Sequence, residues 1–251
     1  MSRWWGRGAP FLATALLVPA LGQPGDRGAS FPALELLGVM STPVQAASAA
    51  LDHVILAIND LEKGIAEFAA VTGVTPIVGG EHPGRGTRNA LVSLGEGAYL
   101  EILAPGAGIT NPDSIIPYRS LTVGGWALRP ARLDQALEAL RAGGLGPVGP
   151  QAGSRRKPDG GLLEWRTGGA RGPGLGLAPF LIEWSPASAH PSSTSPAGCR
   201  LLGIEVRERD PEPLRKYLEA VGYSVAVTAG DPGLVVRLAC PRGTVSFGTM
   251  E

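Results

Sequence analysis

A histidine and a glutamate inside apolar segments are the first residues of this 251-residue chain that point to chemistry. His53 stands in the run LDHVILAI, and Glu101 stands in AYLEILA, where the neighbouring residues are typical of buried strands. An ionised carboxylate in a protein interior loses its hydration, which is costly unless a cation or a hydrogen-bonded partner replaces the water. Glu101 is therefore predicted to have such a partner, and a salt bridge to Arg85 or Arg88 is its simplest structural alternative.

His82 is another of the three histidines of the chain, and it stands in the glycine-rich stretch GEHPGRGTRN. Because imidazole titrates near neutral pH, His82 is a candidate general acid or base beside Glu101, although a structural role in the turn explains it equally well. The stretch is too short and too unlike G-x-x-x-x-G-K-[ST] to bind a nucleotide. Thr87 and Asn89 are candidate ligand-binding residues that could instead fix the turn.

Strand alternation places these groups relative to their neighbours. His53 shares one face of its predicted strand with Ile55, and Glu101 shares one face of its strand with Tyr99. Both faces of each strand carry apolar residues. This pattern is expected if one face meets a helix and the other lines a cavity.

The elements that position these residues recur three times from Leu51 onward. An apolar strand is followed by a short amphipathic helix with apolar residues at i, i+4 and i+7, then by a stop at glycine and further short strands. The copies begin with LDHVILAI, LTVGGWALR and RLLGIEVRE. Each copy is thus a βαβββ unit, which exposes an apolar sheet face when alone and must pack or pair. The sequence predicts an α+β fold.

The domain boundaries follow from these copies. Two modules occupy residues 51–105 and 120–186 of a domain at 51–186, and a third βαβββ module occupies 199–251. The Ser- and Pro-rich segment 187–198 between them is typical of a linker and predicts a solvent-exposed His190. Residues 1–50 are predicted to be a leader. Arg3 and Arg7 precede an apolar run that suits a signal peptide of residues 1–22 or 1–49 and predicts export, whereas a translation start at Met40 would give a cytoplasmic protein.

Composition excludes several classes of function. The chain has 22 Lys and Arg against 22 Asp and Glu, which gives no sign of the basic face that nucleic acid requires. The apolar run near the start is too short for a stable membrane span. No G-x-S-x-G nucleophile motif occurs in the sequence. Cys199 and Cys240 lack the C-x-x-C spacing of zinc and redox sites, so we expect both to be ordinary small apolar residues.

Tandem βαβββ units that open with LDHV and close with YLEIL resemble the vicinal oxygen chelate superfamily. The segment GGEHPGRGTRNALVSLGEGAYLEIL is similar to its glyoxalase-like branch, and RRKPDGGLLEW and PFLIEW extend the resemblance over about residues 51–186. The resemblance implies that two modules curl into half-barrel sheets around a central cavity that holds a divalent metal ion. The third copy is similar in layout but lacks these motifs, so we expect a partial module that completes or covers the sheet.

The resemblance also implies a set of metal ligands. His53 in the first strand and Glu101 in the last strand of module one are expected to converge on the cavity, and Glu183 lies in the corresponding last strand of module two. The segment LTVGGWALR has no His, Glu or Gln for a fourth ligand, so His82 is the candidate to fill the gap. These donors suit Zn, Fe, Mn or Ni and do not choose among them. A histidine such as His53 at a strand start is as often a hydrogen-bonded edge of the core.

Three further residues are candidates for substrate binding. Trp126 and Trp184 fall in predicted strands of module two, where they would form apolar walls of a ligand cavity or of the core. Arg156, in the charged turn SRRKPDGG, could bind a substrate carboxylate through its forked guanidinium or remain at the surface.

Two functions compete on this basis. The first is a metal-dependent enzyme of the lyase, isomerase or dioxygenase type, which chelates vicinal oxygens of a small molecule and stabilises an enolate or a similar intermediate. The alternative is a metal-free protein of the same fold that binds or sequesters a small molecule, as the incomplete ligand set and the tryptophans suggest. A module with a closed cavity and a role in interaction only is the third. Three modules leave one without a partner, which suggests a homodimer.

Overall fold

The computed structural model describes residues 49–249. The signal-peptide predictions for residues 1–22 and 1–49 and the alternative start at Met40 therefore fall on a segment that lies almost wholly outside the described residues. Within residues 49–249, no helix is both long enough and apolar enough to cross a bilayer.

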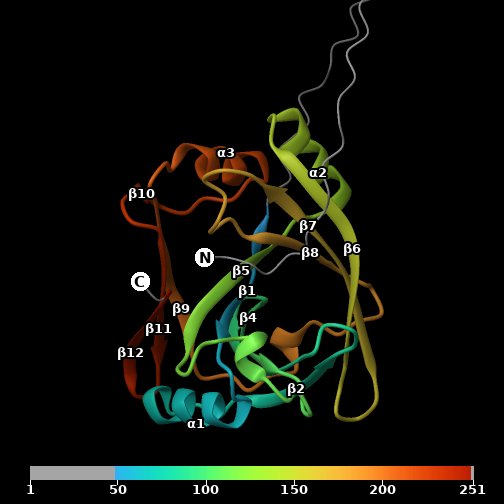
Figure 1. Cartoon of the computed structure of the whole chain (residues 1–251), viewed down its shortest axis with the longest axis vertical. Coiled ribbons are helices and arrows are strands. Elements are labelled where there is room, and N and C mark those ends of the chain that lie inside the picture. The colour runs from blue at the N-terminus through green and yellow to red at the C-terminus, as the bar shows by residue number, and fades with distance from the viewer. Residues whose placement is uncertain (1–48, 250–251) are drawn as a thin grey trace, which may run out of the picture. The chain divides into compact units, whose positions relative to one another are not determined.

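Three βαβββ modules follow one another along the chain, as the repeat predicts (Figure 1). Module one consists of β1 (Ala50–Ala57), α1 (Leu61–Thr72), β2 (Ile77–His82), β3 (Thr87–Gly95) and β4 (Ala98–Pro105). Module two consists of β5 (Thr122–Arg129), α2 (Leu133–Ala142), β6 (Gly146–Arg156), β7 (Leu162–Arg171) and β8 (Phe180–Trp184). Module three consists of β9 (Arg200–Glu208), α3 (Glu212–Ala220), β10 (Val227–Ala229), β11 (Gly233–Cys240) and β12 (Gly243–Gly248). The short helices η1 (Pro112–Ser114) and η2 (Pro191–Ser193) lie between modules.

The first two modules close into one barrel in the order β1-β4-β3-β2-β6-β7-β8-β5. Within each module the first and last strands are parallel neighbours, β1 beside β4 and β5 beside β8. The two modules meet where β1 and β5 run antiparallel and where Glu81 of β2 pairs with Arg156 of β6. The predicted curled half-sheets are therefore confirmed, and they join along both edges, so that no strand of the barrel has an open edge.

Helix α1 shows why the sequence pattern predicts these elements. Asp60 has an extended backbone before the helix, and its side chain accepts a hydrogen bond from the backbone N–H of Lys63. Gly73 ends the helix at φ 80°, a left-handed conformation that glycine adopts without steric cost. Leu61 and Phe68 are buried on one side of the helix. They pack into a core between the helix and the outer face of the strands.

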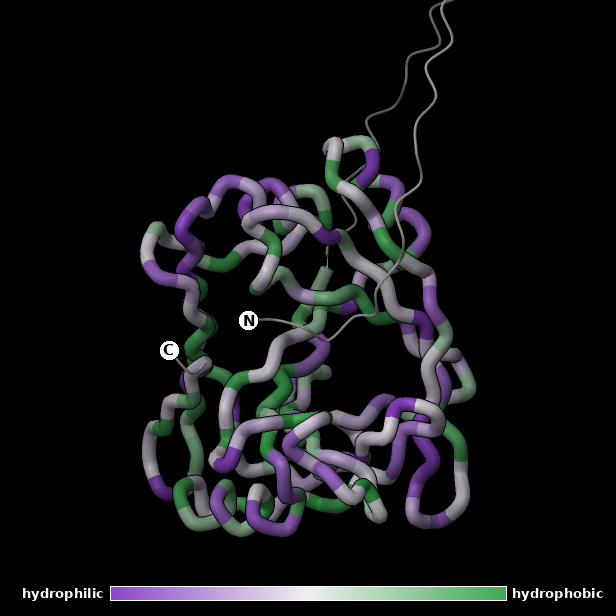
Figure 2. Tube along the Cα trace, viewed as in Figure 1, coloured by the Kyte–Doolittle hydropathy of each residue, from purple (hydrophilic) through white to green (hydrophobic). Residues whose placement is uncertain are grey.

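The third module forms a separate sheet in the order β10-β9-β11-β12. Its buried residues Ile204, Val206 and Val236 belong to the same apolar core as Val54 and Leu56 of β1. Strands β11 and β12 contact β5, so this sheet covers the outside of the barrel, as expected for a partial module. Figure 2 shows hydrophobic residues concentrated along the central strands and hydrophilic residues frequent in the loops.

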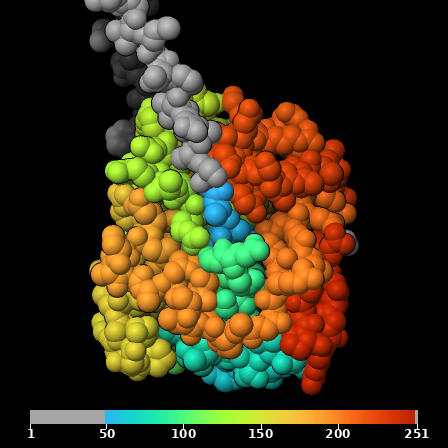
Figure 3. Space-filling model, turned by 180° about the vertical axis from the view of Figure 1, so that it is seen from behind, coloured from blue at the N-terminus to red at the C-terminus, as the bar shows by residue number. Residues whose placement is uncertain are grey.

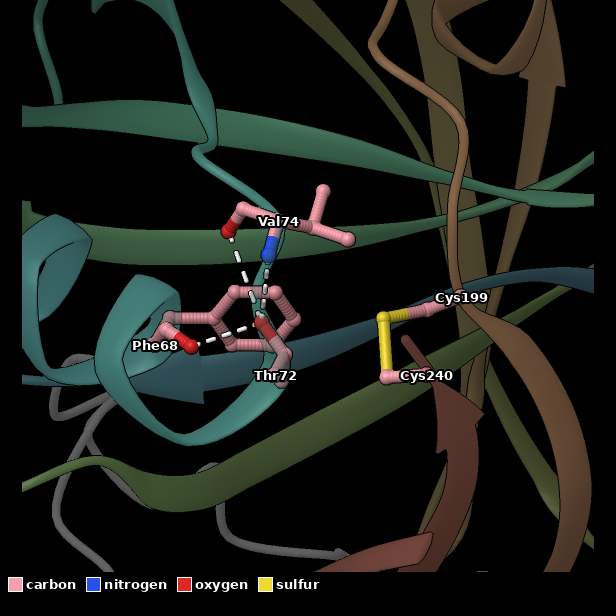
Figure 4. Close-up of a disulfide and its surroundings, with 5 residues drawn as sticks. All are labelled: Phe68, Thr72, Val74, Cys199 and Cys240. Atoms are coloured by element: carbon pink, nitrogen blue, oxygen red, sulfur yellow. Dashed lines mark hydrogen bonds between the residues drawn. A yellow bond between two sulfur atoms is a disulfide. The ribbon is translucent and has the colours of Figure 1, made fainter. Parts of the chain in front are cut away.

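A disulfide joins Cys199, just before β9, to Cys240 at the end of β11. The expectation that both cysteines are ordinary apolar residues is therefore wrong, because strand pairing in module three brings together two residues that are 41 positions apart. Figure 4 shows the disulfide beside the end of α1, where the Thr72 hydroxyl donates to the Phe68 carbonyl and accepts from the Val74 N–H.

The disulfide is predicted to stabilise module three. In the chain-entropy treatment, a cross-link between residues 41 positions apart raises the free energy of unfolding by up to about 4 kcal/mol. The Cys199→Ser/Cys240→Ser variant is therefore expected to unfold at a clearly lower urea concentration than the oxidised protein. The matching control is a reducing agent, which should destabilise the wild type and leave the double variant unchanged. Equal urea midpoints for the two proteins would contradict this role.

The segment between modules two and three packs on the barrel instead of projecting from it. Helix η2 contacts β3 and β4, and the backbone N–H of Ser93 donates to the carbonyl of Pro196 at 2.8 Å. Figure 3 shows this orange segment running across the rear of the molecule. The side chains of this segment can therefore contact residues of the barrel on that side.

Candidate functional site

Strands β1 and β4 bring His53 and Glu101 to the same side of the sheet. His53 pairs with Tyr99, and Glu101 lies two residues further along β4 on the same face. The pairing of β1 with β5 shifts at Asp52, since Leu51 faces Leu128 while His53 faces Ala127. Such a bulge lets two successive side chains approach one region. His53 also contacts Phe180 of β8, which is not its neighbour strand, so this face points into the barrel.

The carboxylate of Glu101 lies between two imidazoles. His53 Nε2 is 3.6 Å from Glu101 Oε2, and His82 Nε2 is 3.7 Å from Glu101 Oε1. The side chains of Glu101 and His82 keep only 8% and 9% of their exposure, so a water-sized molecule can touch them in an otherwise buried setting. The structure therefore brings His53, Glu101 and His82 together.

Each imidazole is held through its other ring nitrogen. His53 Nδ1 is 2.7 Å from Asp52 Oδ1, and His82 Nδ1 is 2.9 Å from the Thr87 hydroxyl. Because Asp52 is a carboxylate, it fixes the His53 tautomer with the proton on Nδ1 and leaves Nε2 directed at Glu101. The predicted ligand-binding residue Thr87 thus orients His82.

Asn89 lies between Glu101 and Arg155 and contacts both side chains. Its Nδ2 donates to Glu101 Oε1 at 2.6 Å and is 3.4 Å from His82 Nε2, while its Oδ1 faces Arg155 Nη1 at 3.4 Å. Asn89 therefore belongs to this cluster, and its predicted role in ligand binding stays a prediction. Its amide hydrogens occupy the side of Glu101 that faces His82.

Asp52 is the centre of a second set of bonds that the sequence did not reveal. Its Oδ2 accepts from Arg129 Nη1 at 3.0 Å and from Trp184 Nε1 at 3.1 Å, and it lies 3.0 Å from His190 Nε2. The expectation that His190 is an exposed linker residue is wrong, because the linker packs on the barrel and returns His190 to the site. The sequence signal that could have pointed to this network is that Asp52 directly precedes His53.

The half of the barrel interior that module two contributes contains a buried apolar and aromatic cluster. Trp165 lies between His82, at 6.0 Å between ring centroids, and Trp184, at 5.1 Å. Ala127, Leu163 and Ile182 complete this buried cluster, with Phe180 and Trp184 packed against it. Trp184 therefore lies beside this cluster and also donates to Asp52, and its predicted role in substrate binding stays a prediction.

Glu183 does not join the cluster. Its Oε1 accepts from the backbone N–H of Leu133 at the start of α2, and its Oε2 accepts from Arg166 Nε at 3.0 Å. The neighbour Ile182 occupies the interior face of β8, and strand alternation sends Glu183 to the outer face, toward the helix. The prediction of Glu183 as a metal ligand is therefore not supported by its position.

Trp126 and Arg156 also lie away from the site. Trp126 Nε1 donates to the carbonyl of Leu177, and its ring packs on Tyr223 of module three. The Arg156 side chain is exposed, whereas the preceding residue, Arg155, is buried beside Asn89. In both cases the side chain one position away in the strand faces the interior, so these two substrate-binding predictions are corrected.

The residues present do not fit a resident divalent metal ion. The parallel register relates His53 and Glu101 of module one to Ala127 and Ile182 of module two, so the corresponding positions carry no donor atoms. The Asn89 amide already bonds to Glu101 Oε1, and an N–H donor and a metal ion compete for the lone pairs of that oxygen. Among residues 49–249, no group of three or more His, Cys, Asp or Glu side chains could hold a metal ion.

The environment keeps Glu101 ionised and His82 neutral. Burial raises the pKa of Glu101, but His82, His53, the Asn89 hydrogen bond and Arg155 together outweigh it and leave that pKa below its usual value. Burial also lowers the pKa of His82, and the nearby charge of Glu101 does not reverse this. At neutral pH the site therefore holds a carboxylate beside an uncharged imidazole.

The carboxyl group of Asp52 also stays ionised. Burial acts to raise its pKa, but hydrogen bonds with His190 and His53 and their charges hold the pKa well below its usual range. Burial, together with the charges of Glu101 and Asp52, raises the pKa of Tyr99, so its phenol stays protonated.

These pKa shifts predict that acid destabilises the fold. Groups whose folded-state pKa is depressed bind more protons when unfolded, so their stabilisation is lost as pH falls. The free energy of unfolding should begin to fall below about pH 6.5 because of His82, and more steeply below about pH 4 because of Asp52 and Glu101. Urea denaturation at a series of pH values measures this, and His82→Gln should remove the first part. A stability that is constant from neutral pH to about pH 4 would be the opposite result.

Comparison with known proteins identifies the fold. Residues 51–222 match the protein family described as glyoxalase-like domain. No curated protein sequence matches the chain. A hypothetical protein from Staphylococcus aureus aligns with a TM-score of 0.55 and 14% identity over 80% of this chain and 85% of that chain. Methylmalonyl-CoA epimerase from Mycobacterium tuberculosis aligns with a TM-score of 0.41 and 22% identity over 58% of this chain and 95% of that chain.

At these identities the structural likeness concerns the fold alone, and the S. aureus protein carries it over most of both chains. The sequence match is independent of it and spans both barrel modules and the beginning of module three. This chain belongs to the glyoxalase-like domain family and has the vicinal oxygen chelate fold.

Proposed function

We propose that the barrel is the active site of a metal-independent acid–base enzyme, of the isomerase or lyase type, for a small molecule with oxygens on adjacent carbons. The observation that carries the proposal is the placement of two anchored imidazoles against the two oxygens of one buried carboxylate, at 3.6 and 3.7 Å. Groups with different protonation preferences in one enclosed site are the usual components of proton transfer.

In this proposal Glu101 is the base. Its Oε2 has no hydrogen bond from Asn89 and takes a proton from a carbon next to a carbonyl group, while the electron pair of the C–H bond moves onto the carbonyl oxygen. His53 is the acid in its protonated form, because Asp52 stabilises an imidazolium, and Nε2–H then donates to that oxygen. Delivery of a proton to the opposite face of the same carbon gives an epimer, and delivery to the neighbouring carbon, whose hydroxyl group then loses its proton, gives an isomer. His82 and Asn89 position the carboxylate.

Proton exchange with solvent tests the proposal without knowledge of the natural substrate. Hydroxyacetone, dihydroxyacetone and phenylpyruvate are incubated with the protein in D₂O, and NMR follows deuterium at the carbon beside the carbonyl. The proposal expects exchange that a chelator does not inhibit and that protein purified without chelators catalyses with no bound metal. Stoichiometric metal whose removal abolishes exchange would overturn the metal-independent mechanism.

A second function is favoured by the aromatic half of the barrel. Trp165, Trp184 and Phe180 form a wall that can hold a planar molecule without chemistry. A protein that sequesters a small molecule would bind members of the same panel and catalyse no exchange. Quenching of tryptophan fluorescence in the absence of deuterium incorporation would favour this function.

A further inference from the structure

Arg155 of β6 is a buried cation with an unused hydrogen-bond donor. Only 3% of the residue is exposed, and its Nε has no hydrogen-bond partner within the described chain. Within residues 49–249 its one hydrogen bond is with Asn89, whose Oδ1 is 3.4 Å from Nη1. None of the ion pairs within residues 49–249 includes Arg155. A buried guanidinium that forms no ion pair is unfavourable, because water does not replace its lost hydration and the charge of Glu101 offsets the loss only in part.

The backbone opposite leaves room for this side chain. A Cβ atom added to Gly79 of β2 would lie 2.8 Å from Arg155 Nη1 and 2.4 Å from Asn89 Oδ1, which are both closer than real Cβ contacts. Any larger residue at position 79 would therefore displace Arg155 or Asn89. Glycine here keeps the guanidinium and the amide in place together.

Asn89 connects this cation to the proposed base. Its Oδ1 faces Arg155, and its Nδ2 donates to Glu101 at 2.6 Å, so the guanidinium and the carboxylate lie on two sides of one amide group. A molecule bound beside this amide group would meet a fixed positive charge at one end and the proton acceptor at the other. Burial lowers the pKa of Arg155, although the charge of the Glu101 carboxylate acts in the opposite direction.

We propose that Arg155 binds a carboxylate of the ligand, so that the substrates of this barrel are small carboxylic acids with a compact apolar body against Trp165. This inference rests on the proposed function only for the position of the reacting carbon beside Glu101. The carboxylate accepts from Arg155 Nε and from a terminal nitrogen, a forked geometry that guanidinium matches and an ammonium group does not.

Matched pairs of neutral and charged probes test the inference in the wild-type protein. Acetate is compared with acetamide and benzoate with benzamide, with tryptophan fluorescence for affinity and the Arg155 Nε–H resonance for the site. We expect the carboxylate of at least one pair to bind at least about tenfold more tightly than its amide and to shift that resonance. Equal binding of both members of each pair, or binding that leaves the resonance unmoved, would overturn the inference.

A pair of adjacent arginines supplies the variants. Arg155→Gln should lower benzoate or acetate affinity by about tenfold to hundredfold, with Arg155→Lys intermediate, whereas the exposed neighbour Arg156→Gln should bind like the wild type. Equal losses in the variants of Arg155 and Arg156 would also overturn it. Glu101→Gln separates the two proposals, because it should abolish proton exchange and keep the preference for carboxylates.

Discussion

Replacement of Glu101 with glutamine is expected to lower the rate of proton exchange by about 10²- to 10⁴-fold. Glutamine has nearly the same shape, but it cannot accept a proton from carbon, and its amide adds a donor where Asn89 already donates. The initial rate of deuterium incorporation in D₂O measures the effect. Ligand affinity should change far less than the rate, since the substitution removes the base and not the walls of the site.

Glu183 provides the matched control for Glu101. It has the same residue type in the corresponding last strand of module two, but it bonds to Arg166 and to the start of α2 outside the barrel. Glu183→Gln should therefore exchange protons at the wild-type rate, with at most a modest loss of stability. Equal rates for Glu101→Gln and the wild type would exclude Glu101 as the base, and a large loss of rate in Glu183→Gln would return it to the site.

The fold could be predicted from the sequence because each copy of the repeat is marked by apolar spacing, caps and stops that involve residues close in sequence. The first predicted helix has apolar residues at Leu61, Ile65 and Phe68, a cap at Asp60 and a stop at Gly73, and it extends over Leu61–Thr72. The same strand–helix–strand order recurs twice. Such signals depend on residues that are close in sequence, so they do not require knowledge of how strands pair.

The errors in the site have one physical origin. Strand side chains alternate, so an error of one residue sends a side chain to the opposite face. The interior positions are Ala127, Arg155 and Ile182 in the places where the sequence pointed to Trp126, Arg156 and Glu183. Bulges shift the register next to Asp52 and between Val148 and Gln151. They help to decide which residues of a strand face the interior, and they depend on pairing with the neighbouring strand. Local sequence does not reveal them.

Contacts between distant segments were the other gap. Arg129 is 77 residues from Asp52, and His190 is 138 residues away, yet both lie 3.0 Å from the same carboxylate oxygen. Spacing gave no reason to join them, because their approach follows from barrel closure and from the path of the linker. His53 and Glu101 could be joined in advance because the resemblance made their strands neighbours.

Asp52→Ala is expected to lower the free energy of unfolding by about 3 to 5 kcal/mol, since it breaks a buried ionic network by removing one partner. The Asp52 side chain is fully buried and bonds to four groups, namely His53, Arg129, Trp184 and His190. Alanine would leave the Trp184 N–H without its acceptor and would remove the carboxylate partner of Arg129. Urea denaturation at neutral pH measures the loss.

Two further variants define what that loss means. Asp52→Asn keeps one acceptor oxygen and nearly the same volume, so it should lower the free energy of unfolding less than alanine does. Its free energy of unfolding should also fall less steeply at acid pH, because the carboxyl group with the depressed pKa is gone. Asp159→Ala removes an exposed aspartate paired with Lys157 and should leave stability nearly unchanged. If Asp52→Ala were as stable as Asp159→Ala, the bonds around Asp52 would result from the fold without stabilising it. His53 would then need another group to set its tautomer, and its role as the acid in proton transfer would lose its physical basis.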